Sequence, residues 1–320
     1  MKVIGGFYEL LLPQNSFDYH DGALALSTGR ACIRVIINSL GIKKCHIPNY
    51  TCDAVYDPFD KEGVKYELYS IDENMDPVTL PVLAEGEYFY YINYYGVKSS
   101  TIEMLYEIYG NKLLIDNTHD FFKKRHHDCL SFTSARKYFG VPDGAFLYHH
   151  PNFGVDATRF NEYSLTHSVE RLKGNQEKGF EEFQKYEKSL NSEIYQISKL
   201  SEKMLSLVDV DRVKRKRQEN FQTLRTMLQE QNSLSLKHIG DDDVPFAYPF
   251  LPYDYFNKTS LYQFNIFIPT LWADPLARNE SNEFETRLAT SLLSLPIDER
   301  YNKEDMKFMA THILKNINDA

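Results

Sequence analysis

The chain has 320 residues, with 36 Lys or Arg against 45 Asp or Glu, so its formal net charge is −9 at pH 7. An acidic excess repels phosphate backbones and argues against nucleic acid as the main partner, although small anions can bind where positive charge is gathered locally. The length can bury a large core and fits one large α/β unit with a smaller appendage.

The cysteines and the N-terminus indicate a cytosolic chain. Four cysteines without a C-x-x-C pair indicate free thiols rather than a disulfide framework. The opening MKVIGGFYELLLPQ has an apolar run broken by Glu9 and Pro13, too short for a signal peptide or a membrane span. We therefore expect a cytoplasmic location and no membrane partner.

The first half of the sequence alternates helical and strand patterns. Residues 27–42 have apolar side chains at near-helical spacing and are stopped by Gly41, which predicts a helix. A short strand over 43–50 and a helix over 51–63 follow. Runs rich in β-branched and aromatic residues then predict further strands at 64–72, 87–96, 112–121 and 144–150, and a strand followed by a loop within 127–137. This alternation is typical of a mainly parallel α/β sheet.

The second half begins with amphipathic helices, predicted over 161–205 and 211–231 because apolar residues recur at spacings of three and four. We interpret its basic run, 212–217, as a solvated helix face. A smaller α+β unit closes the chain, with predicted strands at 244–252, 265–272 and 292–298 and helices at 253–264 and 302–317. We expect a large domain over 1–235 and a small domain over 236–320.

Three polar clusters fall at predicted strand ends or helix starts. Ser27 to Arg30 open a helix, where free N–H groups, the helix dipole and an arginine favour an anion, although ordinary capping is the alternative. Asp116 ends a strand at the edge where open α/β sheets bind ligands, with a helix cap as its alternative. Ser134 and Lys137 lie between two buried strands, and a solvated turn is the alternative there.

Taken together, the clusters match what pyridoxal phosphate requires. Its phosphate needs backbone donors, its ring nitrogen needs an anion, and its aldehyde needs an amine. We therefore predict that Lys137 holds this cofactor.

The chain also resembles the DegT/StrS-type sugar aminotransferases. The resemblance follows seven motifs in order: ALSTGRACI, IPNYTCDAV, INYYG, LLIDNTHDF, SARKYFGVPDGAFL, RVKRKRQENFQTLRTML and SLLSLPIDERYNKEDMKFM. It implies the fold-type-I architecture of pyridoxal-phosphate-dependent transferases, with a mainly parallel seven-stranded sheet flanked by helices and a small α+β C-terminal domain. It further implies a homodimer, because the active site of this fold lies between subunits.

Residue by residue, the resemblance implies three catalytic roles. Lys137 is the Schiff-base lysine, Asp116 the partner of the pyridine nitrogen, and His119 the side chain near the ring oxygen. It also implies a set of phosphate and ring contacts, namely Gly29, Arg30, Ala31, Cys52 and Ser134. Substrate contacts are expected from Tyr94, Tyr95 and Trp272.

Three positions depart from the family pattern. Arg30 stands where Thr is usual, Cys52 where an aromatic side chain stacks on the pyridine ring, and Phe132 where Ser is common.

The implied reaction converts a nucleotide-linked keto sugar to an amino sugar, with glutamate as amino donor, for cell-surface polysaccharide or a related glycan. Two alternatives are a sugar-dehydratase branch, which replaces the lysine with histidine, and a non-catalytic relative. We predict no metal site, because His126, His127, Asp128 and Cys129 are adjacent and alternate between the two faces of a strand.

Overall fold

Seven strands from the first half of the chain form one sheet, in the order β1-β7-β6-β5-β4-β2-β3. The computed structural model describes residues 6–8, 10–126, 128–148, 153, 155–236, 239–240, 242–278 and 281–318. The strands of this sheet are β1 (Leu24–Leu26), β2 (Lys44–Pro48), β3 (Lys65–Tyr69), β4 (Glu87–Ile92), β5 (Leu113–Asp116), β6 (Leu130–Ser134) and β7 (Ala145–Tyr148). Only β7 runs against its neighbours, β1 and β6, so the expected mainly parallel sheet is confirmed.

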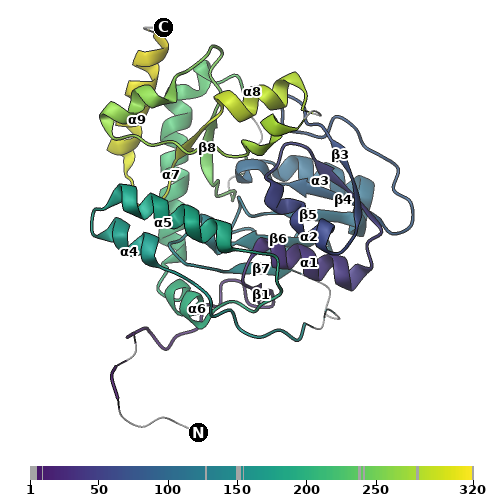
Figure 1. Ribbon diagram of the computed structural model, residues 1–320. Helices are drawn as coiled ribbons and strands as arrows, with labels where there is room; N and C mark the ends of the chain where they lie inside the picture. Colours follow the sequence, from purple (N-terminus) through teal and green to yellow (C-terminus); the bar gives the residue numbers. More distant parts are fainter. Residues whose placement is uncertain are drawn as a thin grey trace.

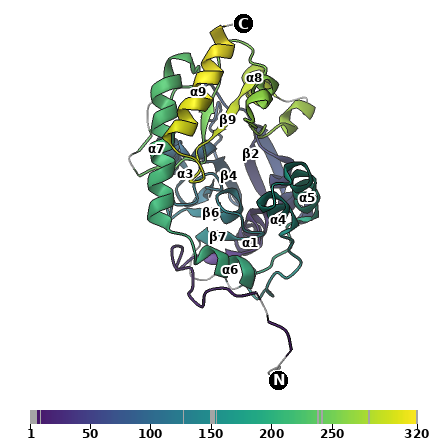
Figure 2. The same cartoon turned by 90° about the vertical axis from the view of Figure 1, so that its left-hand side faces the viewer.

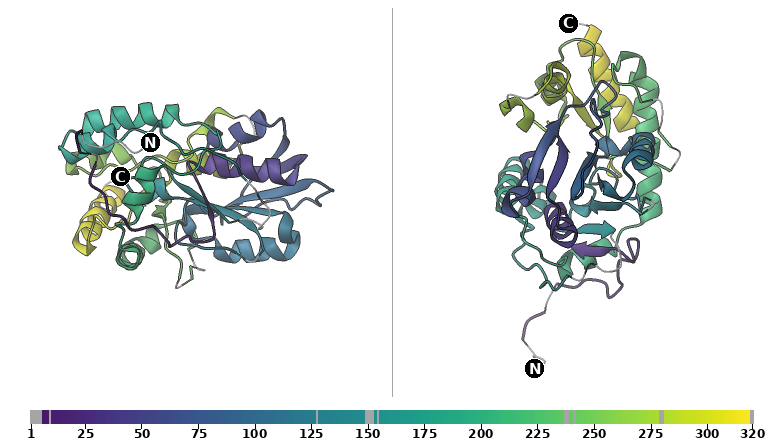
Figure 3. Two further views of the ribbon diagram at one scale, coloured as in Figure 1. Left: turned by 90° about the horizontal axis from the view of Figure 1, so that it is seen from below. Right: turned by 90° about the vertical axis from the view of Figure 1, so that its right-hand side faces the viewer.

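Helices cover both faces of the sheet (Figure 1). Helices α1 (Gly29–Leu40) and α2 (Asp57–Lys61) lie on one face and α3 (Ser99–Tyr109) on the other (Figure 3). The start of α1 is fixed by Thr28, whose Oγ1 accepts a hydrogen bond from Ala31 N at 3.1 Å. Its end is fixed by Gly41, which adopts the left-handed conformation at φ 59°.

Four helices follow the sheet, α4 (Thr166–Leu172), α5 (Gln176–Ser189), α6 (Lys199–Leu205) and α7 (Val210–Leu228). Helices α4 and α5 pack against each other as a hairpin. Gly179 permits this close approach, because a Cβ there would lie only 3.2 Å from the carbonyl oxygen of His167. Helix α7 runs from beside α6 to the C-terminal unit (Figure 2).

The C-terminal unit contains the antiparallel pair β8 (Ala247–Phe250) and β9 (Leu293–Pro296), with α8 (Glu283–Ser291) and α9 (Lys303–Asn318). Helix α9 packs along α7 (Figure 2).

Two predicted elements of this unit are wrong. Residues 265–272 form no strand, and within the predicted helix at 253–264 only a short 3-10 helix forms, η6 (Lys258–Phe264). Asn265 and Trp272 both adopt left-handed backbone, with φ 57° and 51°, at the two ends of the predicted strand. Left-handed residues do not fit a regular strand, so the segment stays irregular.

No helix in the described part of the chain is long and apolar enough to cross a bilayer.

Candidate active site

The predicted site residues gather where the parallel strands end. Strand β5 ends at Asp116 and β6 ends at Ser134, and the chain then turns through η4 (Ala135–Lys137) before reversing into β7. Helix α1 begins just after β1. The three polar clusters therefore meet at the carboxyl edge of the sheet, where open α/β folds bind ligands.

Asp116 is a buried carboxylate held by two donors. The Tyr90 hydroxyl donates to its Oδ2 at 2.6 Å, and the backbone N–H of Thr118 donates to its Oδ1 at 2.8 Å. Among the described residues, no lysine, arginine or histidine forms an ion pair with this carboxylate. The side chain is therefore held in one orientation, and it can still take a cationic partner.

His119 lies three residues after Asp116 and is 1 % exposed. Its ring stacks on Phe246, with centroids 4.5 Å apart. Burial, aided by the charge of Lys137, lowers the pKa of His119 well below its usual value, so the imidazole is neutral. Its Nδ1 is buried and has no hydrogen-bond partner in the described part of the chain.

Lys137 presents a free amine at this edge. Its Nζ lies 5.9 Å from the centre of the Phe246 ring. Within the described ranges, Nζ has neither a hydrogen bond nor an ion pair. Its charge nevertheless reaches both His119 and Cys52, whose pKa values it lowers. An amine without a structural partner among the described residues, whose charge acts on a neutral imidazole, is available for chemistry.

At the start of α1, two backbone N–H groups have no hydrogen-bond acceptor among the described residues. The helical hydrogen-bond ladder begins at Cys32 N, and Ala31 N is taken by the Thr28 cap, so Gly29 and Arg30 have no helical acceptor for their N–H groups. A Cβ at Gly29 would meet the Phe132 ring at 3.1 Å, so glycine allows the helix end to sit close to β6.

Arg30 turns away from this helix end. Its NH1 donates to the carbonyl oxygen of Leu190 at 2.8 Å, just after α5. Burial and then the nearby charge of Arg136 lower the pKa of its guanidinium. In this structure the side chain of Arg30 therefore binds the segment after α5, whereas its backbone N–H stays at the helix start.

Cys52 and Ser134 are the two remaining predicted cofactor contacts, and the charge of Lys137 acts on the first of them. The pKa of the Cys52 thiol is raised, mainly by burial. The charge of Lys137 opposes this rise, and the charges of Asp116 and Asp274 add to it. Ser134 is buried at the end of β6, three residues before Lys137.

The three predicted substrate residues contact the site through aromatic packing. Trp272 lies 4.8 Å from His119 and Tyr95 lies 5.7 Å from it, measured between ring centroids. Tyr94 packs edge-on against Trp272 at 5.3 Å, and its hydroxyl donates to the carbonyl oxygen of Tyr50 at 2.8 Å.

Sequence reasoning missed three residues. Tyr90 orients Asp116. The period of two along β4 places Tyr90 on one face of the strand with Ile92, which pairs with Asp116. Phe246 and Tyr138 were also missed. Phe246 reaches His119 from just before β8, and the Tyr138 hydroxyl donates to the carbonyl oxygen of His119 at 2.7 Å. Neither has a local signal, because their roles depend on how distant segments dock.

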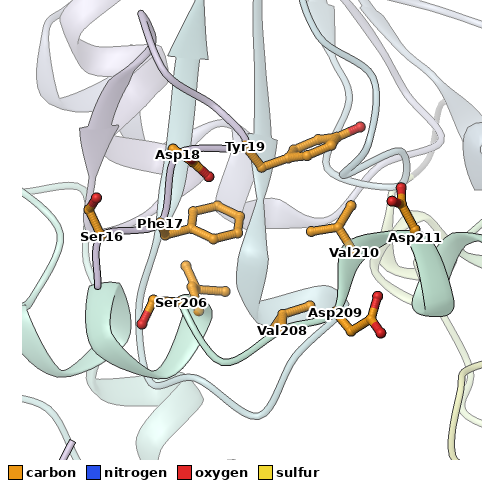
Figure 4. A pocket seen from close by; sticks show the side chains of 10 residues that line it. Ser16, Phe17, Asp18, Tyr19, Ser206, Val208, Asp209, Val210 and Asp211 are labelled. Carbon is orange, nitrogen blue, oxygen red and sulfur yellow. The ribbon is translucent and has the colours of Figure 1, made fainter. Parts of the chain in front are cut away.

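Other possible sites lie elsewhere. No group of three or more His, Cys, Asp or Glu side chains within the described ranges could hold a metal ion, and His127 of the His/Asp/Cys run lies outside them. A cavity of about 390 Å³ opens near α6, lined by side chains that include Asp18, Asp209 and Asp211 (Figure 4). None of the predicted site residues lines it.

Comparison with known proteins supports the fold and extends no further. No protein-family profile matches the chain, and no curated protein sequence matches it either. Among solved structures, a DegT/DnrJ/EryC1/StrS aminotransferase from Brucella abortus has 12% identity and a TM-score of 0.62, over 92% of this chain and 85% of that one. PseC from Helicobacter pylori, an aminotransferase of pseudoaminic acid biosynthesis, has 13% identity and a TM-score of 0.62, over 97% and 93%.

Spr1654 from Streptococcus pneumoniae, assigned as a sugar aminotransferase and solved in its PLP form, has 11% identity and a TM-score of 0.62, over 93% and 87%. These similarities span nearly the whole of each chain. The chain therefore has the fold of these aminotransferases, which confirms the fold-type-I architecture expected from its motifs.

Proposed function

We propose that this protein is a pyridoxal-phosphate-dependent aminotransferase that converts a nucleotide-linked keto sugar to an amino sugar. The observation that carries the proposal is the amine of Lys137, which forms no hydrogen bond or ion pair within the described residues and lies at the same sheet edge as the buried carboxylate of Asp116 and the neutral ring of His119. Similarity to sugar aminotransferases of the same fold supports the choice of reaction and cofactor.

The residues present fit pyridoxal phosphate. The N–H groups of Gly29 and Arg30 at the start of α1 suit a phosphate, because unsatisfied helix donors and the helix dipole favour an anion. Asp116 lacks a cationic partner among the described residues and suits a protonated ring nitrogen. The unpartnered Nδ1 of His119 suits a hydrogen bond to a ring oxygen.

When bound, such a cofactor supplies an electron sink for the bond that breaks at the substrate. The chain supplies positioning and proton transfer. Tyr90 and the Thr118 N–H fix the carboxylate of Asp116, so that its charge can hold a proton on the ring nitrogen. Nζ of Lys137 binds the cofactor and, once released, moves the proton at the reacting carbon of the substrate as general base and acid.

The lysine also separates this proposal from its main rival. Members of the related sugar-dehydratase branch replace that lysine with histidine, whereas this chain has Lys137. The amine is needed to return the proton in transamination. A non-catalytic relative would have no need of an unpaired amine at this position.

The direct test is reductive trapping. The protein is incubated with pyridoxal 5′-phosphate, reduced with borohydride, digested and analysed by mass spectrometry. We expect the label on Lys137, and we expect it to be lost in Lys137→Ala. The control variant Lys123→Ala should keep the label, because Lys123 forms an ion pair with Asp243 at 3.7 Å. A label on another lysine, or none, would contradict the proposal.

The finer parts of the proposal concern substrate, assembly and location. We propose glutamate as donor, a glycan pathway as destination, a homodimer and a cytoplasmic location, all on the strength of the motif resemblance. Mass spectrometry of products after incubation with glutamate and a panel of nucleotide keto sugars tests the reaction, and light scattering tests the dimer.

A further inference from the structure

Trp272 extends from the C-terminal unit into the Lys137 site. It is the only tryptophan of the chain. Its ring centroid lies 4.8 Å from His119 and 5.3 Å from Tyr50. Its backbone is left-handed, with φ 51°, which is rare for a bulky side chain and persists only where the surroundings hold it.

Arg278 provides that hold. Its guanidinium donates to the carbonyl oxygens of Asn49 and Thr51 and forms an ion pair with Asp53. The Thr51 contact is 3.0 Å long, and only 15% of the arginine side chain is exposed. Asp274 adds a second link, because its Oδ2 accepts from Asp53 N at 3.2 Å. We call residues 272–278 the strap; it is fastened to the loop at residues 49–53.

The strap covers buried polar atoms that lack partners. Tyr50 Oη, Thr51 Oγ1 and His119 Nδ1 have no hydrogen-bond partner in the described part of the chain. Such atoms are costly to bury and commonly face a ligand or water. Within the same loop, Cys52 stands where the motif resemblance implies an aromatic side chain that stacks on the cofactor ring, so this position supplies no ring. Trp272 is the aromatic side chain that the strap brings against Tyr50 and His119 instead.

We propose that Arg278 is a positioning residue that fastens the strap and thereby holds Trp272 as the aromatic wall of the Lys137 site. The statement that this wall binds pyridoxal 5′-phosphate rests on the proposed function. The fastening does not, because every contact of Arg278 lies within the chain.

Fluorescence of the single tryptophan tests the fastening in cofactor-free protein. Arg278→Ala is expected to shift Trp272 emission to longer wavelength and to raise its acrylamide quenching constant about twofold, because the strap opens locally. Arg278→Lys should give an intermediate value, since a single ammonium cannot reproduce the three-way contact. Arg287→Ala is the matched control, because Arg287 also donates to backbone carbonyls, of Pro252 and Tyr253, but not to the strap.

Parent-like quenching in folded Arg278→Ala, or an equal rise in Arg287→Ala, would overturn the fastening. If Arg278→Ala does not fold, Asp53→Asn removes the ion pair and keeps the carbonyl contacts. A smaller rise in quenching is then expected, and parent-like quenching would overturn the proposal.

The wall role is tested with pyridoxal 5′-phosphate itself. Trp272→Leu should bind it about three- to tenfold more weakly, the size of a lost aromatic contact, while borohydride still labels Lys137. Labelling of Lys137 with parent-like affinity in Trp272→Leu would reject the wall and leave the proposed function standing. Absence of labelling in the parent would reject the proposed function and the wall, and the quenching data would still decide the fastening.

Discussion

At the scale of single residues, Asp116 is the group whose charge the proposed chemistry depends on most. Asp116→Asn preserves the shape of the side chain and one oxygen acceptor for Thr118 N, so the fold should survive. Its loss of charge removes the support for a protonated ring nitrogen. We expect the turnover of sugar and glutamate to fall by about 10²- to 10³-fold, as for other removed active-site electrostatic contacts.

Tyr90→Phe is the matched control, because it removes only the hydroxyl that donates to Asp116 Oδ2 at 2.6 Å. Turnover in this variant should fall less than in Asp116→Asn, because the carboxylate keeps its charge and its hydrogen bond from Thr118 N. Steady-state kinetics with both variants makes the comparison. Unchanged turnover in Asp116→Asn would remove this carboxylate from the mechanism.

His20 is a second residue with a testable charge state. It is 3% exposed, its Nδ1 lies 2.7 Å from the Tyr148 hydroxyl, and burial followed by the charge of Lys124 lowers its pKa to about 3. The unfolded chain, with an ordinary histidine pKa near ~6.5, binds this proton more readily than the folded protein. The contribution to stability is therefore complete above about pH 6.5 and is lost as pH falls toward 3.

The unfolding free energy should thus decline by up to about 1.4 kcal/mol per pH unit from this one site within that window. Urea titrations at several pH values measure the slope. His20→Phe should flatten it, whereas His312→Gln, on α9 at the far end of the molecule, should leave it unchanged. The same slope in His20→Phe as in the parent would assign the acid sensitivity to other groups.

At the scale of elements, the sequence predicts those parts of the site that are encoded locally. Helix α1 could be located because Thr28 and Gly41 give its two ends and apolar spacing gives its face. The end of β5 could be located because its apolar run stops at a polar residue, Asp116. Local chemistry was sufficient for these elements.

Elements that depend on a distant partner could not be predicted in this way. Residues 265–272 look like a strand because Ile266 and Ile268 are spaced two residues apart, yet within the described ranges this segment pairs with no strand. Arg30 is a similar case. Its position at a helix start indicates an anion contact, but its side chain binds Leu190 O, 160 residues away in sequence.

At the scale of the whole molecule, the site is built from both units. Asp116, His119 and Lys137 come from the large sheet, whereas Phe246 and Trp272 contact His119 from the C-terminal part of the chain. No periodicity in the sequence reports how the two parts dock. This explains why Asp116, His119 and Lys137 could be identified from local motifs, whereas Phe246, which reaches His119 from a distant segment, could not.

Glu285 is central to that docking. It is completely buried near the start of α8, where its carboxylate accepts from Asn49 Nδ2 at 2.9 Å, Ile71 N at 3.0 Å and Asn282 N at 3.1 Å. Asn49 and Ile71 follow β2 and β3 of the large sheet. Glu285→Ala would leave these donors buried without an acceptor, so we expect the unfolding free energy to fall by about 3 kcal/mol or more.

Glu283→Ala is the matched control, since Glu283 also lies in the first turn of α8 but is exposed. It should change the urea midpoint little, because exposed acidic side chains near a helix start contribute less than about 1 kcal/mol. A double-mutant cycle with Asn49→Ala then measures the contact across the units, with a coupling of about 1–3 kcal/mol expected for residues in one buried network. Equal midpoints for Glu285→Ala and Glu283→Ala, or a coupling near zero, would show that the C-terminal unit is held on the sheet by other contacts.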